Sequence, residues 1–193
     1  MLHMTYFYNC SKPYLDSISP DLYKGITGAL SKLKKRATQA EINKDLFWLL
    51  TTKGWSYDTT PAGLASAPQT DLPIEKISLA EIKNQNSRDL SLTSANLETR
   101  WHADFGKLYA GQLVQLEAQF GKVEAMFKDF CGFRIAFAER RLALGIEIVI
   151  SAPTKYFAHR KNAVSGMASF DIAKNTLATI GLDCPIWLIG IKE

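Results

Sequence analysis

The sequence has little cysteine and no long apolar run. Its three cysteines are far apart and form no CxxC or Cys/His cluster, which argues against a disulfide framework and against a structural zinc site. No segment approaches the roughly 20 apolar residues that a membrane-spanning helix needs, and the chain does not begin with a basic leader and an apolar core. We therefore expect a protein of the reducing cytoplasm, without a membrane partner.

Internal repeats, low-complexity blocks and a strong charge imbalance are also missing. The chain has 193 residues, of which 47% are hydrophobic and 22% are charged, and this composition fits one globular domain over residues 1–193. Its net charge of +4 permits a polyanionic partner without requiring one. Residues 56–74, rich in small and turn-forming residues, predict a long loop rather than a domain boundary.

Helix starts are marked at three places in the first half of the chain. A serine followed by proline at 19–20 predicts the first helix, whose apolar stripe continues to residue 33. A serine or threonine followed three residues later by glutamate is a capping box, and it predicts helices that start at Thr38 and at Ser78. The second of these helices ends at Lys53-Gly54 and the third is short.

Strands and helices alternate in the second half. Predicted strands cover 101–109, 113–120, 144–150 and 185–191, and predicted helices cover 123–140 and 170–182. A short connection with a glycine joins the first two strands into a hairpin, and the later strands are joined by helical crossovers. We expect an α/β fold, a three-layer α/β/α arrangement whose central mixed sheet is antiparallel at the hairpin and parallel beyond it.

The strand 113–120 (LVQLEAQF) alternates strictly between apolar and polar residues. Because successive strand side chains point to opposite faces, Gln115, Glu117 and Gln119 share one face of the sheet. One interpretation is an antiparallel strand with one wet face. The other is a carboxylate and an amide that face a phosphate and a metal ion.

The hairpin geometry favours the second interpretation. A turn centred between residues 110 and 111 places Asp104 opposite Glu117 and His102 opposite Gln119. One face of the sheet would then carry the oxygen-rich surface that Mg²⁺ prefers. This prediction depends on the register, since a slip of one residue would turn Asp104 to the other face.

An aspartate, a hairpin and then Glu-x-Gln resemble the PD-(D/E)xK nuclease core, in the variant in which glutamine replaces the lysine. Over most of its length the chain resembles the type II restriction endonucleases of the BglII and BstYI group, BstYI most closely. The segments that carry the resemblance are INKDLFWLLTTKGW (42–55), DF (104–105), LEAQFGK (116–122), LGIEI (144–148), SGMASFD (165–171) and WLIGI (187–191).

This resemblance implies a restriction-endonuclease-like fold and the Mg²⁺-dependent hydrolysis of double-stranded DNA at a short palindrome, leaving 5′-phosphate ends. Asp104, Glu117 and the backbone carbonyl of Ala118 would hold the Mg²⁺, while Gln119 would orient the attacking water or a phosphate oxygen. Lys122 would contact the phosphate backbone or a base edge; it would otherwise be a solvated lysine at a helix start. The palindrome would have six bases and contain GATC.

The spacing of the two acids departs from the family pattern. Asp104 and Glu117 lie further apart along the chain than in the relatives, and an ungapped alignment puts Leu108 at the acid position. Extra residues divided equally between the two strands keep Asp104 opposite Glu117. With any other division the first metal ligand is Glu98 or is missing. Alternatives are therefore a catalytically impaired DNA-binding protein and a nicking or repair nuclease of the same core.

The resemblance places the base contacts in residues 151–171. Phosphates would be neutralised by the basic side chains of this segment: Lys155, His159, Arg160 and Lys161. Its small or flexible residues would approach base edges in the major groove: Ser165, Gly166, Met167 and Ser169. The basic cluster is equally typical of a solvated helix face.

A protein that reads a palindrome and cuts both strands is expected to be a homodimer, because two-fold symmetry presents each recognition element once per subunit. The predicted helix 123–140 offers an apolar face for such an interface, formed by Met126, Phe130, Phe133 and Phe137. The same face would also serve for core packing against the sheet.

Overall fold

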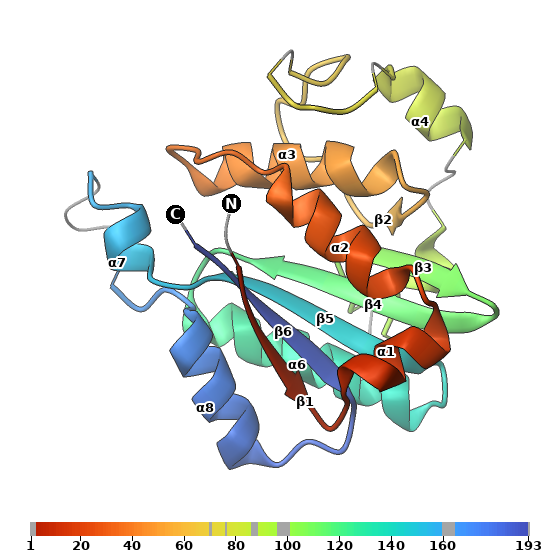
Figure 1. The fold of residues 1–193 in the computed structure, drawn as a ribbon, viewed down its shortest axis with the longest axis vertical. Helices are drawn as coiled ribbons and strands as arrows, with labels where there is room; N and C mark the ends of the chain where they lie inside the picture. Colours follow the sequence, from red (N-terminus) through yellow and green to blue (C-terminus); the bar gives the residue numbers. More distant parts are fainter. Residues whose placement is uncertain are drawn as a thin grey trace.

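A six-stranded mixed sheet forms the centre of the computed structural model, which describes residues 3–69, 71–75, 77–85, 89–95, 101–159 and 165–192 (Figure 1). Its strand order is β1-β6-β5-β4-β3-β2. The strands are β1 (His3–Tyr8), β2 (Ser56–Tyr57), β3 (Phe105–Tyr109), β4 (Gln112–Gln119), β5 (Leu142–Ile150) and β6 (Ile186–Ile191). Strands β4, β5 and β6 are parallel, and β1, β2 and β3 pair antiparallel with their neighbours. The mixed sheet was predicted; strands β1 and β2 were not.

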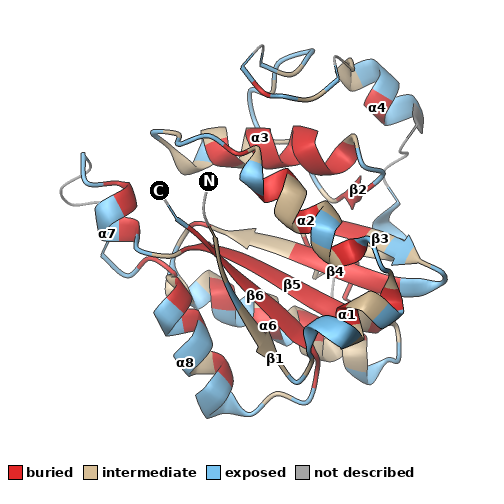
Figure 2. Cartoon of the chain, in the orientation of Figure 1, coloured by how far each residue is buried: buried red, intermediate tan, exposed pale blue. Residues whose placement is uncertain are grey.

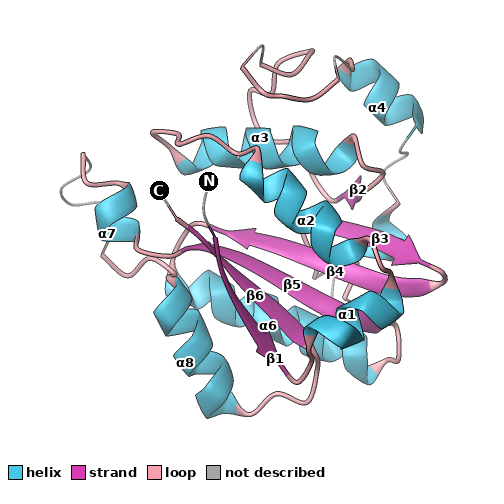
Figure 3. Ribbon diagram, in the orientation of Figure 1, coloured by secondary structure: helices cyan, strands magenta, loops and turns pink. Residues whose placement is uncertain are grey.

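Helices pack on both faces of the sheet (Figure 3). They are α1 (Lys12–Ile18), α2 (Leu22–Ser31), α3 (Gln39–Thr51), α4 (Leu79–Gln85), α5 (Leu90–Thr93), α6 (Val123–Ala138), α7 (Pro153–Tyr156) and α8 (Phe170–Ile180). None of the helices in the described part of the chain is long and apolar enough to span a bilayer.

Two hydrophobic cores lie on opposite faces of the sheet. Helices α1, α2 and α3 pack on one face, where Trp48 and Ile146 are among the buried residues. Helices α6 and α8 pack on the other face, where Phe130 and Leu188 are buried. Strands β5 and β6 are buried along nearly their whole length (Figure 2), as expected for parallel strands covered on both sides. The predicted three-layer α/β/α fold is confirmed.

The helix starts agree with the sequence at two of the three predicted places. Thr38 and Glu41 form the complete capping box of α3. The backbone N–H of Ser78 donates to the Glu81 carboxylate before α4. The prediction for the first helix is wrong by two residues, because Ser19 is the C-cap of α1 and α2 begins at Leu22. Its apolar stripe is nevertheless buried as expected.

The hairpin of β3 and β4 has the predicted register. Ala110 and Gly111 both have positive φ, 49° and 82°, the conformation of a two-residue turn that matches the twist of the strands. Phe105 pairs with Leu116 and Tyr109 with Gln112, so Asp104, directly before β3, continues this register toward Glu117. The first strand is shorter than predicted, because it begins at Phe105.

Candidate active site

The polar face of β4 is covered by other parts of the chain rather than wet. Gln115 is 1% exposed, and its Nε2 donates to the backbone carbonyls of Leu92, Thr93 and Ser94, each at 3.0 Å. Gly106 on β3 makes room for this segment, since a Cβ at that position would lie 2.2 Å from the Leu92 oxygen. The interpretation of β4 as an ordinary strand with one solvated face is therefore wrong.

Asp104 and Glu117 are joined by backbone hydrogen bonds at the end of β4. The N–H of Asp104 donates to Glu117 Oε2 at 3.2 Å, and the N–H of Ala118 donates to Asp104 Oδ2 at 3.0 Å. The two side chains line different cavities. Asp104 lines one of about 100 Å³ beside α3, and Glu117 lines one of about 10 Å³ beside α6. The backbone of Asp104 therefore contacts the Glu117 carboxylate at the end of β4, while the two side chains line separate cavities.

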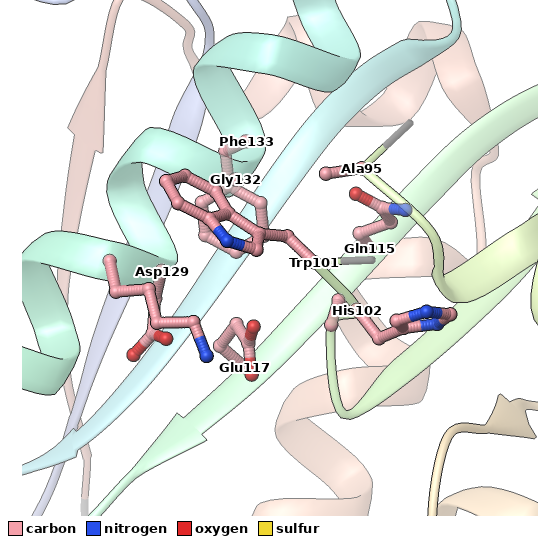
Figure 4. A pocket seen from close by; sticks show the side chains of 10 residues that line it. Ala95, Trp101, His102, Gln115, Glu117, Asp129, Gly132 and Phe133 are labelled. Atoms are coloured by element: carbon pink, nitrogen blue, oxygen red, sulfur yellow. The ribbon is translucent and has the colours of Figure 1, made fainter. Parts of the chain in front are cut away.

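Two further acids lie near Glu117. Glu147 is its direct neighbour in the parallel ladder of β4 and β5, is 0% exposed, and has no hydrogen-bond partner for either carboxylate oxygen in the described part of the chain. Asp129 on α6 lines the same small cavity as Glu117 (Figure 4). Four carboxyl groups thus gather around the end of β4, those of Asp104, Glu117, Asp129 and Glu147.

The pKa values of these acids reflect their crowding. Burial raises the pKa of Glu117 well above its usual value, and the charges of Asp104 and Asp129 raise it further. Burial followed by the charges of the other three acids does the same to the pKa of Glu147. The pKa of Asp129 rises to about 6, chiefly through burial. The pKa of Asp104 is also raised, again mainly by burial. Such a group of acids is destabilised when ionised and binds a cation favourably.

Both polar atoms of the Gln119 amide form hydrogen bonds within the protein. Its Nε2 donates to Asp129 Oδ2 at 2.9 Å, and its Oε1 accepts from the N–H of Gly121 at 2.8 Å. Gln119 therefore fixes the connection between β4 and α6 and holds Asp129 near Glu117. Its predicted role in orienting a water or a phosphate oxygen stays a prediction.

His102 does not lie opposite Gln119, and this prediction is wrong. Because β3 begins only at Phe105, His102 lies outside the hairpin ladder and forms an isolated bridge with Ser94. Its Nδ1 lies 3.3 Å from Asp58 Oδ1. His102 is nevertheless among the residues that line the cavity beside Glu117, although its ring points away from Glu117 (Figure 4).

The oxygen atoms around Asp104 fit a hard divalent cation. Asn43 of α3 lines the cavity with Asp104 and Ala118, and its buried Oδ1 has no hydrogen-bond partner in the described part of the chain. Carboxylate, amide and carbonyl oxygens are the ligands that Mg²⁺ takes. No three His, Cys, Asp or Glu side chains among the described residues form a ready metal cluster. A metal ion here would therefore depend on amide, backbone or water oxygens as well as on carboxylates.

The predicted DNA contacts differ in how accessible they are. Lys122, Lys155, Ser165 and Gly166 are exposed, and Gly166 has a positive φ of 74°. Arg160 and Lys161 lie outside the described residues, as does Glu98, the alternative metal ligand.

Two of the predicted base contacts also have structural roles within the fold. Met167 is 6% exposed and belongs to the hydrophobic core beside α3. The Ser169 hydroxyl caps α8 by accepting from the N–H of Ile172 at 3.4 Å. The base contacts expected of Met167 and Ser169 stay predictions.

The apolar face of α6 is core. Met126, Phe130 and Phe133 are buried and Phe137 packs against them. This face packs within the subunit rather than forming an interface. The expected homodimer stays a prediction.

Sequence reasoning missed Glu147, Asp129 and Lys128, although the first two left a signal. Glu147 interrupts an otherwise apolar buried strand (LGIEIVI), where a charged residue is rare without a purpose. Asp129 stands between Met126 and Phe133 on the inward side of α6. Neither could be joined to Glu117 before the strand order was known.

Comparison with known proteins gives a family and a fold. The family model described as "Restriction endonuclease BglII/BglIII" matches residues 4–191. The crystal structure of restriction endonuclease BglII complexed with a DNA 16-mer matches with a TM-score of 0.61 and 19% sequence identity, covering 100% of this chain and 79% of that chain. At this identity the structural likeness is one of fold. No curated protein matches the chain.

Proposed function

Because the chain belongs to the BglII/BglIII family of restriction endonucleases and is thus a type II site-specific deoxyribonuclease, we propose that its reaction depends on Mg²⁺ held at the end of β4. Asp104, Glu117 and the backbone carbonyl of Ala118 are the proposed ligands. The likeness to BstYI in particular stays a prediction.

The observation that carries this proposal is the contact between Asp104 and Glu117. Hydrogen bonds join Asp104 N–H to Glu117 Oε2 and Ala118 N–H to Asp104 Oδ2. Both carboxylates therefore lie at the end of β4. The unpartnered Oδ1 of Asn43 adds a neutral oxygen in the cavity that Asp104 lines. Asp104 and Glu117 are 13 positions apart along the chain, and the hairpin register, in which Phe105 pairs with Leu116, supports their approach.

Each residue has a proposed task in phosphodiester hydrolysis. A bound divalent cation would lower the pKa of a water molecule and neutralise charge on the phosphate. Asp104 and Glu117 would hold their carboxylates toward that site, helped by hydrogen bonds that fix their positions. Gln119 would keep Asp129 in place through its Nε2 bond, and it would orient the attacking water only after releasing part of this network.

DNA recognition is proposed for four basic residues and for two small residues. Lys122, Lys155, Arg160 and Lys161 would contact phosphates, and Ser165 and Gly166 would approach base edges. We propose a homodimer acting in the cytoplasm on a six-base palindrome that contains GATC, with both strands cut to leave 5′-phosphate ends.

A supercoiled-plasmid assay with Mg²⁺ tests the proposal. The wild-type protein should cut both strands of the plasmid and convert it to linear fragments. Glu117→Ala and Glu117→Gln should abolish this cleavage. Glu139→Ala serves as the matched control, since Glu139 is exposed at the far end of α6. Sequencing of the fragment ends would give the recognition site.

The alternatives give different products in the same assay. Binding to DNA without any cleavage at high protein concentration would identify a catalytically impaired DNA-binding protein. Nicked circles without linear product from a monomer would identify a nicking or repair nuclease. Equal cleavage by the wild type and Glu117→Gln would overturn the assignment of Glu117.

A further inference from the structure

The end of β4 has no cation at the position where nucleases with Glu-x-Lys carry a lysine. Gln119 cannot be charged, and both ends of its amide are bound, to Asp129 and to Gly121. A phosphate brought to Asp104 and Glu117 would therefore meet carboxyl groups and a neutral amide. A cationic side chain other than residue 119 could share with the proposed Mg²⁺ the stabilisation of the negative charge that increases on a phosphate during its hydrolysis.

Lys128 lies where such a cation is needed. It is in the second turn of α6, and it lines the cavity of about 10 Å³ that Glu117 and Asp129 also line. Among the described residues that line this cavity or the one beside Asp104, it is the only lysine or arginine. Lys122, the basic residue nearer in sequence, is exposed at the start of α6 and lines neither.

Lys128, Glu117 and Asp129 line the same cavity, and the charge of Lys128 acts on both acids. Burial raises the pKa of Glu117 and of Asp129, and the charge of Lys128 opposes this rise at both carboxyl groups. A single ammonium thus acts on the proposed metal ligand and on the acid that Gln119 holds. Lys128 itself is exposed, so its flexible side chain can reach a group that arrives from solvent.

The backbone around Lys128 is held in place. Gln119 at the end of β4 donates to Asp129, the residue that follows Lys128, at 2.9 Å. On the opposite side of α6, Met126 and Phe130 are fully buried in the core. The second turn of α6 is therefore fixed relative to β4 by one polar contact and by packing.

We infer that Lys128 is a further catalytic residue, whose ammonium contacts the scissile phosphate and supplies the positive charge that Gln119 cannot supply. This inference rests on the proposed nuclease function. It concerns an electrostatic contact and adds no bond-forming step. The lysine of the family motif is thus replaced by one on the following helix.

Single-turnover cleavage of a DNA duplex that contains the mapped site tests this inference. With saturating protein and Mg²⁺, Lys128→Met should lower the cleavage rate constant by about 100-fold or more, the usual effect of removing one donor from a developing oxyanion. The Kd for the same duplex, measured with Ca²⁺ in place of Mg²⁺, should change by less than about threefold. Lys128→Arg should recover part of the rate, since it keeps the charge.

Two other lysines separate this role from general DNA binding. Lys24→Met, at an exposed position on α2, is the control and should change neither quantity. Lys122→Met should weaken binding and reduce its dependence on salt, with a smaller effect on the rate at saturation. Thermal unfolding of every variant would show that the fold is intact.

The outcomes for the two proposals are distinct. If the wild type does not cleave DNA with Mg²⁺, the proposed function fails, whatever Lys128 does. If the wild type cleaves and Lys128→Met retains its rate within about twofold, the inference is overturned. It is also overturned if Lys128→Met loses affinity in proportion to rate, because Lys128 would then only bind DNA.

Discussion

Glu147 lies directly beside Glu117 on the neighbouring parallel strand, and it is fully buried with neither carboxylate oxygen hydrogen bonded within the described part of the chain. Both side chains project toward α6, where Asp129 adds a third carboxyl group. Repulsion among these carboxyl groups should weaken the fold when no cation is bound, so we expect the free energy of unfolding to depend on pH and on metal ions.

Without metal, the free energy of unfolding should fall as the pH rises above the usual pKa of a glutamate. Burial raises the pKa of Glu147 well above its usual value, so above that usual value the folded state holds a proton that the unfolded state has already released. The stabilisation is complete below the unfolded pKa and is lost as the pH rises through the folded pKa. Glu147→Gln should make this decline shallower, as measured by urea unfolding from acid to neutral pH in EDTA.

The exposed Glu124, at the start of α6, provides the comparison for that experiment. Glu124→Gln should leave the pH profile unchanged. The raised pKa of Glu147 would be contradicted if the free energy of unfolding of the wild type increased from acid to neutral pH and Glu147→Gln showed the same profile.

Mg²⁺ should stabilise the wild-type protein. A ligand that binds only the folded state adds about 2.7 kcal/mol to the free energy of unfolding at a concentration about 100 times its Kd. Asp104→Asn and Glu117→Gln should remove this gain, and each should stabilise the metal-free protein by relieving repulsion between carboxylates. Thermal unfolding with Mg²⁺ and with EDTA measures both effects.

Asp16→Asn, on the exposed surface of α1, is the control for the metal experiment and should respond to Mg²⁺ like the wild type. An equal rise in melting temperature for Glu117→Gln would show that the ion binds elsewhere.

Metal affinity should increase with pH. Because burial and neighbouring charges raise the pKa of Glu117, and raise that of Asp129 to about 6, protons compete with the metal in mildly acidic solution. Calorimetric titration in two buffers of different ionisation enthalpy should detect proton release on Mg²⁺ binding below neutral pH, and less release at higher pH. Binding that is independent of pH and releases no protons would contradict these pKa shifts.

The hairpin turn should be improved by asparagine. Ala110 has a φ of 49°, which is unfavourable for alanine and well tolerated by asparagine, and Gly111 follows with a φ of 82°. Ala110→Asn should raise the free energy of unfolding by about 0.5–1 kcal/mol, the usual scale of such backbone effects. Gly111→Ala should lower it. If urea unfolding showed that both variants raise, or both lower, the free energy of unfolding, the turn geometry would be contradicted.

Gln115 should hold the 89–95 segment against the sheet. Gln115→Leu removes the amide that donates to the carbonyls of Leu92, Thr93 and Ser94. The Thr93 carbonyl still accepts from the N–H of Ala103 and the Ser94 carbonyl from Arg141, so the expected cost is about 1–3 kcal/mol, for the Leu92 carbonyl alone. Hydrogen exchange should then become faster in α5 and in β3. Gln112→Leu, at the exposed start of the same strand, should have little effect. Unchanged exchange in Gln115→Leu would show that packing alone holds the segment.

Local rules of sequence determined several elements of this protein. The capping box of Thr38 and Glu41, the alternation of β4 and the Ala110-Gly111 turn each involve residues within a few positions, and their effects on the backbone do not need the rest of the fold. The turn alone set the hairpin register, and with it the approach of Asp104 to Glu117. The family resemblance rested on short segments too, among them LEAQFGK (116–122) and WLIGI (187–191).

Only the tertiary structure decided which residues surround Glu117. Glu147 becomes its neighbour through the parallel pairing of β4 and β5, and Lys128 and Asp129 do so through the packing of α6 on that face. Met167 appeared to be a loop residue because its partners in the core come from distant segments. These relationships depend on strand order and on which helix covers which face, and both are set by the burial of apolar surface summed over the whole chain.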